Sequence, residues 1–300
     1  MSQRELSFGF EKKLLEDLST SIRLVNKHLI QAVEDVGLIN ERQEYIYYIT
    51  NPGSLVTLPV SQGGMVDDSL WPFPKAKREY WALNFSLDKR FSHNWVGGFN
   101  YTWSRLTGNY AGLASSDEGG RISPNVERNF DWWYMNYDLK GNPIDGPISN
   151  DRPHYFKAYG AYMFPFGLTV GAAAFGCSGL PLTRQVYFNN GTVYPENRMT
   201  DGRLPFTAWA SLFLEYNLKL GKRYNCALNL YIENVTNTAT AQRKDMTMNR
   251  IGIPVTDEEI LSKNYDYKSN VLLYDPNPMY GLVTTYFPPW SARVGARFSF

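Results

Sequence analysis

Segments of about nine to eleven residues in which apolar and polar side chains alternate recur along this chain, and they restrict its fold more than any other feature. The clearest segment is FTAWASLFLEYNLKL, which begins at Phe206. Successive side chains of a strand point to opposite faces, so one face of this segment is apolar and the other is mostly polar. The segment length is also that of a tilted strand that crosses a bilayer. The pattern therefore predicts an all-β chain with membrane-spanning strands.

These segments are arranged in pairs, and each pair predicts an antiparallel hairpin. Short turns rich in turn-forming residues, such as Pro165 to Gly167, separate the two members of a pair. The predicted hairpins join ELSFGFEKK to LSTSIRLVNK, EYWALNFSLDKRF to WVGGFNYTW, HYFKAYGAYMF to LTVGAAAFG, and FTAWASLFLEYNLKL to CALNLYIEN. Adding the last segment, SARVGARFSF, the sequence predicts about nine antiparallel strands.

Long stretches separate the hairpins, at roughly 28–77, 105–152, 177–205 and 236–289, and they exceed the usual connections of a compact domain. Short turns and long loops thus alternate along the whole chain. This asymmetry is typical of a transmembrane β-barrel, which has short periplasmic turns at one rim and long extracellular loops at the other. The fold class predicted from the residues is accordingly all-β, with the antiparallel strands of a transmembrane β-barrel.

One segment permits a second interpretation. Apolar residues between positions 14 and 36 also fall at a helical spacing, which would make an amphipathic helix. We predict a strand in this segment, and the helix remains open at this stage. The residues that carry the helical spacing are Leu15, Leu18, Ile22, Val25, Leu29 and Val36.

The overall composition excludes several classes of function. A formal net charge of +1 provides no basic footprint for nucleic acid, so we expect no nucleic-acid partner. Cys177 and Cys226 match no metal or redox spacing, and the predicted topology places them at opposite ends of their strands, too far apart for a disulfide. The sequence therefore predicts neither a cofactor nor a metal site.

Aromatic residues in the stretch ASSDEGGRISPNVERNFDWWYMNYD, which begins at Ala114, are the best candidates for ligand contact. Trp132, Trp133 and Tyr134 are adjacent there, and such rings can stack on a sugar. The alternative is that they only bury the loop against its neighbours. Asp117 and Glu118 precede Gly-Gly in the same stretch, which favours a solvated turn over half of an acid/base pair, and no catalytic residue is predicted.

The last strand is apolar on one face up to the final residue. Val294, Ala296, Phe298 and Phe300 share that face, whereas Arg293 and Arg297 share the other. The final residues of a soluble domain usually fray into water, so an apolar face that reaches the terminus needs a partner.

A series of motifs, taken in order, resembles the C-terminal half of TonB-dependent outer-membrane receptors of the Oar-like group. The likeness extends from about Glu5 to Phe300. A terminal Phe preceded by apolar residues at alternate positions resembles the signal by which such barrels are recognised for assembly. The motifs are LSFGFEKKLLEDLSTSIRLVNKHLIQAVEDVG, IYYITNPG, YWALNFSLDKRFSHNW, YTWSRLTGNYAGLASSDEGGRISPNVERNFD, NDRPHYFKAYGAYMFPFGLTVG, SGLPLTR, LNLYIENVTN and RVGARFSF.

The resemblance implies a non-enzymatic, energy-coupled receptor or transporter of the bacterial outer membrane with an unidentified ligand. Its partners would be outer-membrane lipid, the barrel-assembly machinery, and TonB, contacted through a missing N-terminal region. Asn84, Asn100, Lys157 and Glu215 would face the barrel lumen.

The strand number leads to an expectation about domain organisation. Barrels of this group have roughly twenty-two strands and a plug, and an odd set of nine strands cannot close. We expect residues 1–300 to be the C-terminal section of the barrel, with the N-terminal plug and the earlier strands absent from this chain. Two other functions remain open: a secreted, aromatic-rich β protein that binds or hydrolyses carbohydrate, and a passive porin-like channel.

Overall fold

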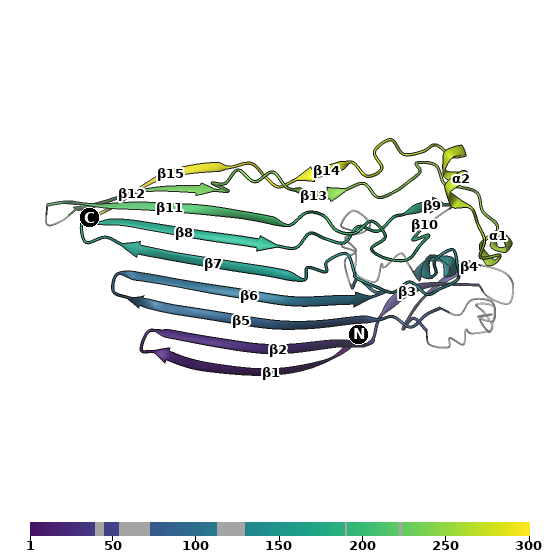
Figure 1. Cartoon of the computed structure of the whole chain (residues 1–300), viewed down its shortest axis with the longest axis horizontal. Coiled ribbons are helices and arrows are strands. Elements are labelled where there is room, and N and C mark those ends of the chain that lie inside the picture. The colour runs from purple at the N-terminus through teal and green to yellow at the C-terminus, as the bar shows by residue number, and fades with distance from the viewer. Residues whose placement is uncertain (40–44, 54–72, 113–129, 190, 222–223) are drawn as a thin grey trace.

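Nine antiparallel strands form one large sheet in the computed structural model, which describes residues 1–39, 45–53, 73–112, 130–189, 191–221 and 224–300 (Figure 1). The sheet order is β1-β2-β5-β6-β7-β8-β11-β12-β15, so each strand pairs with its nearest neighbours in the sequence that belong to this sheet. The bounds are β1 Ser2–Leu15, β2 Leu18–Gln31, β5 Arg78–Ser92, β6 Trp95–Gly108, β7 His154–Met163, β8 Leu168–Cys177, β11 Thr207–Leu220, β12 Tyr224–Glu233 and β15 Ser291–Ser299. The predicted strands and hairpins are confirmed.

The strand register gives the sheet two continuous faces. Phe8 pairs with Leu24 and Leu24 with Leu83, while at the other edge Leu214 pairs with Leu230 and Leu230 with Val294. Residues paired across neighbouring strands lie on the same face. We call the two sides the apolar face, which carries Leu6, Phe8, Leu24, Leu83, Phe99, Phe156, Val170, Leu214, Leu230 and Val294, and the polar face, which carries Asn84, Asn100, Lys157, Glu215 and Arg293.

The two rims of the sheet differ as predicted. At the short-turn rim the hairpins close through only a few residues, and in the β5–β6 turn both His93 and Asn94 have positive φ, as a tight two-residue turn requires. At the loop rim β2 and β5, β6 and β7, β8 and β11, and β12 and β15 are joined by long connections (Figure 1). The segment open to a helical interpretation is strand β2 over most of its length, because its pairing with β1 and β5 decides between the two periodicities.

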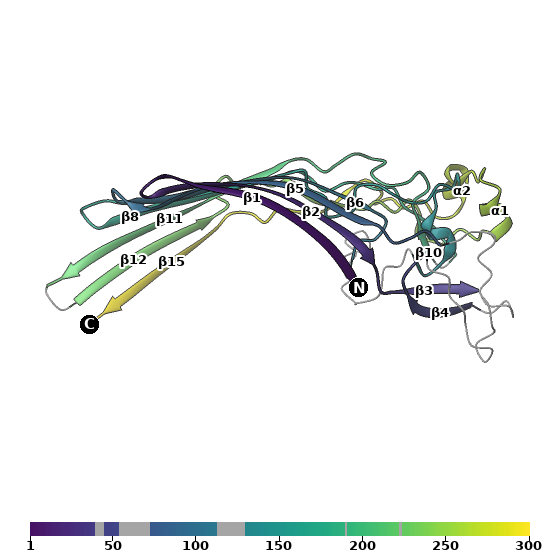
Figure 2. The same ribbon diagram turned by 90° about the horizontal axis from the view of Figure 1, so that it is seen from below.

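The sheet is curved and does not close (Figure 2). β1 and β15 stand at its edges, and within the described residues each pairs on one side only. Five of the strands, β1, β2, β5, β6 and β11, have 14 or 15 residues, more than the segment length used for the prediction. No helix among the described residues is long and apolar enough to span a membrane.

The long connections have a folded structure of their own, which we call the loop layer. Its described residues form three small hairpins and three short helices: β3 Glu34–Ile39 with β4 Tyr45–Thr50, β9 Val186–Phe188 with β10 Gly191–Val193, β13 Ala241–Lys244 with β14 Val283–Tyr286, the 3₁₀ helix η3 Trp133–Asn136, α1 Asp257–Leu261 and α2 Tyr267–Leu273. The largest buried cluster of the described residues lies in this layer and combines residues from three connections. Its members include Met135, Leu139, Val186, Phe188, Ile253, Val255, Ile260 and Val271.

Candidate functional site

The polar face presents a wall of hydrogen-bonding and charged groups. Lys157 pairs with Asn100 across β6 and β7, and the Thr102 hydroxyl donates a hydrogen bond of 2.8 Å to the Asn84 amide oxygen. Glu215 lies on the same face, 4.0 Å from Arg297 of β15. The four residues predicted to share a polar surface therefore do share one.

A shallow apolar depression of about 200 Å³ interrupts this wall over β7, β8 and β11. Its floor is formed by small residues such as Ala161 and Gly171, and the rings of Tyr159, Phe213 and Tyr231 surround it. The depression has the size of one or two side chains and is much smaller than a typical ligand pocket.

The aromatic residues predicted as ligand contacts lie in the loop layer. Tyr134 is only 5% exposed and belongs to the main buried cluster, against which Trp132 and Trp133 pack as partly buried residues. The ring centroids of Trp133 and Tyr134 are 5.6 Å apart in an edge-to-face arrangement. Burial leaves Tyr134 no free ring face, so it supports the two indoles rather than offering a stacking surface.

Arg184 connects two of the long connections. Its guanidinium donates hydrogen bonds to the Tyr280 hydroxyl at 3.0 Å and to the Tyr267 hydroxyl at 3.2 Å, and it forms ion pairs with Glu196 and Asp201. Tyr267 in turn donates to Glu196 at 2.8 Å, and this hydrogen bond is the main reason that the pKa of Glu196 lies below its ordinary value. The network fixes α2 against the segment between β8 and β11.

Asp151 also joins separate parts of the chain, at a position nearer the sheet. Its side chain is almost completely buried, accepts a hydrogen bond from the Leu106 backbone N–H at 2.6 Å and forms an ion pair with Arg203. The Arg203 guanidinium also donates to the backbone carbonyls of Asp151 and Gly179. Sequence reasoning missed both Arg184 and Asp151, because their partners are 12 to 96 residues away in the chain.

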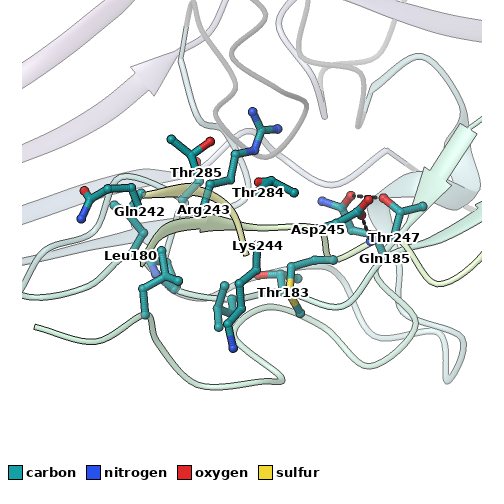
Figure 3. A pocket seen from close by; sticks show the side chains of 15 residues that line it. Leu180, Thr183, Gln185, Gln242, Arg243, Lys244, Asp245, Thr247, Thr284 and Thr285 are labelled. Atoms are coloured by element: carbon teal, nitrogen blue, oxygen red, sulfur yellow. Dashed lines mark hydrogen bonds between the residues drawn. The ribbon is translucent and has the colours of Figure 1, made fainter. Parts of the chain in front are cut away.

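A cavity of about 340 Å³ opens between the segment that follows β8 and the β13–β14 hairpin (Figure 3). The Gln242 amide donates a hydrogen bond of 3.0 Å to the Thr207 hydroxyl, which lies on the polar face at the loop rim. The cavity therefore adjoins the upper end of the polar wall. It is lined by Ser149, Leu180, Pro181, Leu182, Thr183, Gln185, Leu204, Gln242, Arg243, Lys244, Asp245, Met246, Thr247, Thr284 and Thr285.

The charged side chains that line this cavity differ in whether they already form hydrogen bonds or ion pairs with described residues of the protein. The Asp245 carboxylate accepts hydrogen bonds from the Thr247 N–H and the Asn277 amide. Arg243 and Lys244 make no side-chain hydrogen bond or ion pair with any described residue, and Figure 3 shows them extending in opposite directions from β13. A cavity of this size and polarity can hold a small polar ligand.

The terminal strand presents its predicted residues as one row. Val294 is 84% exposed, and Phe298 and Phe300 are also strongly exposed. Register with β12 places Val294, Ala296 and Phe298 on the apolar face. They lie at an open edge, where apolar side chains are covered neither by the sheet nor by the loops.

No metal cluster of three or more His, Cys, Asp or Glu residues occurs in the part of the chain that the structure describes. Cys177 and Cys226 are both free thiols, as predicted. Asp117 and Glu118 lie outside the described residues.

Comparison with known proteins agrees with this architecture. Residues 4–192 match the family described as outer membrane beta barrel domain. The TonB-dependent transporter Oar of Myxococcus xanthus is 27% identical to this chain over 256 residues, which are 82% of the chain and 22% of that protein. The chain thus spans about a fifth of the length of this relative.

One solved structure shows the same fold at lower sequence identity. The outer-membrane transporter YddB of Escherichia coli aligns with 81% of this chain and 30% of its own, with a TM-score of 0.51 and 12% identity. The ferric-catecholate import receptor Fiu of E. coli aligns with 99% of this chain and 27% of its own at 14% identity, but its TM-score of 0.46 is too low to support an argument.

The nine-stranded sheet with one apolar and one polar face, the strict alternation of short turns and long connections, and the match over residues 4–192 lead to one conclusion. The resemblance to TonB-dependent receptors of the Oar-like group is confirmed at the level of homology. This chain belongs to the outer-membrane β-barrel domain family and is a bacterial outer-membrane protein related to TonB-dependent transporters.

Proposed function

We propose that this chain is the C-terminal section of the barrel of a TonB-dependent transporter, which binds an as yet unidentified ligand and carries it across the outer membrane. The observation that carries the proposal is the open sheet, because β1 and β15 each pair on one side only among the described residues. Lipid provides no hydrogen bonds for an exposed strand edge, so each edge needs a partner strand. The remaining strands of a longer protein would supply these partners.

The two faces of the sheet then have separate roles. The apolar face contacts outer-membrane lipid, and the polar face lines the lumen together with a plug domain from the preceding part of the protein. The apolar depression among Tyr159, Phe213 and Tyr231 suits a plug side chain, since it would otherwise face water in the lumen. TonB would contact a segment ahead of the plug and supply the energy for transport.

Ligand capture is assigned to the loop layer. The cavity between the segment after β8 and the β13–β14 hairpin adjoins the lumen wall, and Trp132 and Trp133 provide partly exposed rings in the same layer. The relatives are transporters rather than enzymes, which supports a role in binding and uptake without catalysis.

The terminal row Val294, Ala296, Phe298 and Phe300 is proposed as the signal for the barrel-assembly machinery. Removal of the last aromatic ring by Phe300→Ser should slow insertion into the outer membrane, whereas Ser299→Ala, on the opposite face, should not. Pulse-labelling followed by protease protection measures both rates. Equal insertion of both variants would assign the row to lipid contact only.

The transporter proposal is tested on the native protein isolated from outer membranes. Peptide mass spectrometry should identify a product much larger than 34.4 kDa that contains these 300 residues. This product should bind the purified periplasmic domain of TonB, and deletion of its N-terminal segment should abolish that binding. A native product of 34.4 kDa, or full-length protein that does not bind the TonB domain, would contradict the proposal.

A further inference from the structure

The cavity beside the β13–β14 hairpin lies between two contacts that join separate parts of the loop layer and the sheet. At one border, the Gln185 N–H donates to the Met246 carbonyl and the Met248 N–H donates to the Gln185 carbonyl, both at 2.9 Å. At the other border, the Gln242 amide donates to the Thr207 hydroxyl of the sheet. The opening between these contacts has a volume of about 340 Å³, which lies at the lower end of the range for ligand pockets.

One wall of this cavity is apolar. The segment after β8 and Leu204 supply it, and Leu182 and Leu204 are 7% and 6% exposed. The backbone of this wall is paired away from the cavity, because the Leu182 N–H donates to the Gly202 carbonyl and the Leu204 N–H donates to the Leu180 carbonyl. This wall therefore offers mainly apolar contact to a ligand.

The opposite wall is formed by β13 and carries two basic side chains. Lys244 and Arg243 make no side-chain hydrogen bond or ion pair with any residue that the structure describes. Figure 3 shows Lys244 extending to the side of Leu180 and Thr183, and Arg243 extending to the side of Thr285. Lys244 is partly buried, whereas Arg243 is exposed. Lys244 is thus the unpaired cation next to the apolar wall.

Ser149 adds a polar group to the same cavity. The residue is only 5% exposed, and its hydroxyl is buried without a hydrogen-bond partner among the described residues. Such a group is rare in a native protein and is explained where a ligand completes the site. The Asp245 carboxylate, by contrast, already accepts hydrogen bonds from Thr247 and Asn277. The unused polar groups are therefore mainly donors, which favours a ligand that accepts hydrogen bonds.

We propose that this cavity binds a small organic acid with one carboxylate and an apolar body. The Lys244 ammonium and the Ser149 hydroxyl hold the carboxylate, and the body packs against the leucine side chains of the apolar wall. A hydrogen bond between an ammonium and a carboxylate is stronger than one between neutral groups. One unpaired cation matches a single negative charge better than the two of a phosphate group. The inference rests on the proposed capture of a ligand in the loop layer, and it names the chemical class of that ligand.

The experiment uses the native full-length protein in detergent, with N-acetylleucine as the probe and N-acetylleucinamide as the matched neutral probe. Dissociation constants are measured by saturation-transfer NMR titration, with protein-free micelles as the blank. The parent should bind the acid about tenfold more tightly than the amide, because only the acid presents a carboxylate to Lys244. Lys244→Gln should remove this preference, whereas Arg243→Gln, which removes the neighbouring cation, should retain it. Ser149→Ala should weaken binding of the acid severalfold.

All variants are compared as barrels that keep the heat-dependent gel shift and the loop proteolysis pattern of the parent. Equal affinity of the parent for the two probes, or binding of neither, would overturn the proposal. An equal loss of preference in Lys244→Gln and Arg243→Gln would overturn it too, because the acid would then respond only to the general positive charge of β13. Unchanged binding of the acid in Ser149→Ala would overturn the assigned hydroxyl contact.

Failure of this inference can be distinguished from failure of the transporter proposal. A preparation that binds the periplasmic domain of TonB but does not prefer the acid would overturn only the assignment of the cavity. A preparation that prefers the acid but does not bind the TonB domain would support the cavity as an acid site and contradict the transporter role.

Discussion

Apolar side chains on the apolar face of the nine-stranded sheet are exposed, whereas those of the main cluster in the loop layer are buried. In the sheet, Phe8 is 70% exposed, whereas in the loop layer Val186, Phe188 and Ile253 are fully buried. A soluble protein is organised like the loop layer, with apolar side chains removed from water. The sheet becomes stable only when lipid covers its apolar face. One chain thus combines a part that uses the bilayer as its solvent with a part that has its own core.

Backbone groups are also satisfied differently in the two regions. In the sheet, backbone N–H and C=O groups form hydrogen-bond ladders between neighbouring strands, and these ladders require only the correct register. The loop layer relies on side chains, as in Asn249, whose amide bonds both the N–H and the carbonyl of Tyr187. Asn189 does the same for Val255. We therefore expect single substitutions to act through lipid contact in the sheet and through specific partners in the loop layer.

The largest predicted effect tests whether the two faces of the sheet have different solvents. Leu87→Arg places a charge on the apolar face near the middle of β5 and should destabilise the folded full-length barrel by about 2–4 kcal/mol. Ser86→Arg places the same charge on the polar face and should cost only about 1 kcal/mol, mainly from the lost hydrogen bond to Ser21. Urea unfolding in phospholipid vesicles measures both.

Equal destabilisation by these two variants would mean that both faces of the sheet meet the same environment. In micelles of a short-chain detergent, whose apolar layer is thin and admits water, the two variants should differ less in stability. This comparison separates the effect of lipid from any difference in packing. If the two variants still differ in stability by the same amount in these micelles, the difference would have to be assigned to side-chain packing at Leu87.

Sequence reasoning succeeded for the sheet and failed for the loop layer for a physical reason. A strand with different solvents on its two sides must alternate, so the period alone identified the hairpins, their faces and the polar row of Asn84, Asn100, Lys157 and Glu215. The loop layer has no such period. Arg184 contacts Tyr267 and Tyr280, and a local sequence pattern cannot predict partners so distant in the chain. The aromatic stretch was located correctly in a loop, but only the structure shows that Tyr134 is buried while Trp132 and Trp133 remain partly exposed.

The second prediction tests the loop layer where it joins the sheet. Asp151→Asn keeps the shape of the side chain but removes the negative charge that Arg203 pairs with. Loss of a largely buried pair costs up to several kcal/mol, and because Arg203 is partly exposed we expect about 2–3 kcal/mol. Limited proteolysis should show faster cleavage between β8 and β11, whereas the urea midpoint of the sheet should not move. A shift of that midpoint would show that sheet and loops unfold as one unit.

The third prediction compares packing at two glycines. A Cβ at Gly179 in the loop layer would lie 1.8 Å from the Leu204 carbonyl oxygen, so Gly179→Ala forces the backbone apart and should cost about 1–2 kcal/mol. A Cβ at Gly9 in β1 would meet no atom closer than 3.5 Å, and Gly9→Ala should change stability by less than about 0.5 kcal/mol. Protease resistance of the loops and urea unfolding of the barrel, measured on both variants, test the contrast. Equal effects would mean that the loop layer adapts as easily as the open sheet.

The smallest predicted effect concerns acid and is confined to the loop layer. The Tyr267 hydroxyl, followed by Lys268 and Arg184, lowers the pKa of Glu196 in the folded loops, whereas in an unfolded loop the value is near 4.5. A depressed carboxyl pKa contributes stability above the unfolded value, and this contribution disappears as the pH falls through the folded value. Amide exchange in α2, corrected for the intrinsic effect of pH on exchange, should therefore show easier local opening at pH 3 than at pH 6, while β5 and β6 remain unchanged. In Glu196→Gln the acid loosening of α2 should be smaller but not absent, because the pKa of Asp266, the N-cap of α2, is also lowered by its hydrogen bonds with Ser269. Acid loosening of the same size in this variant would assign the effect to another carboxylate of the loop layer, and equal loosening of β5 and β6 would remove the distinction between the two regions.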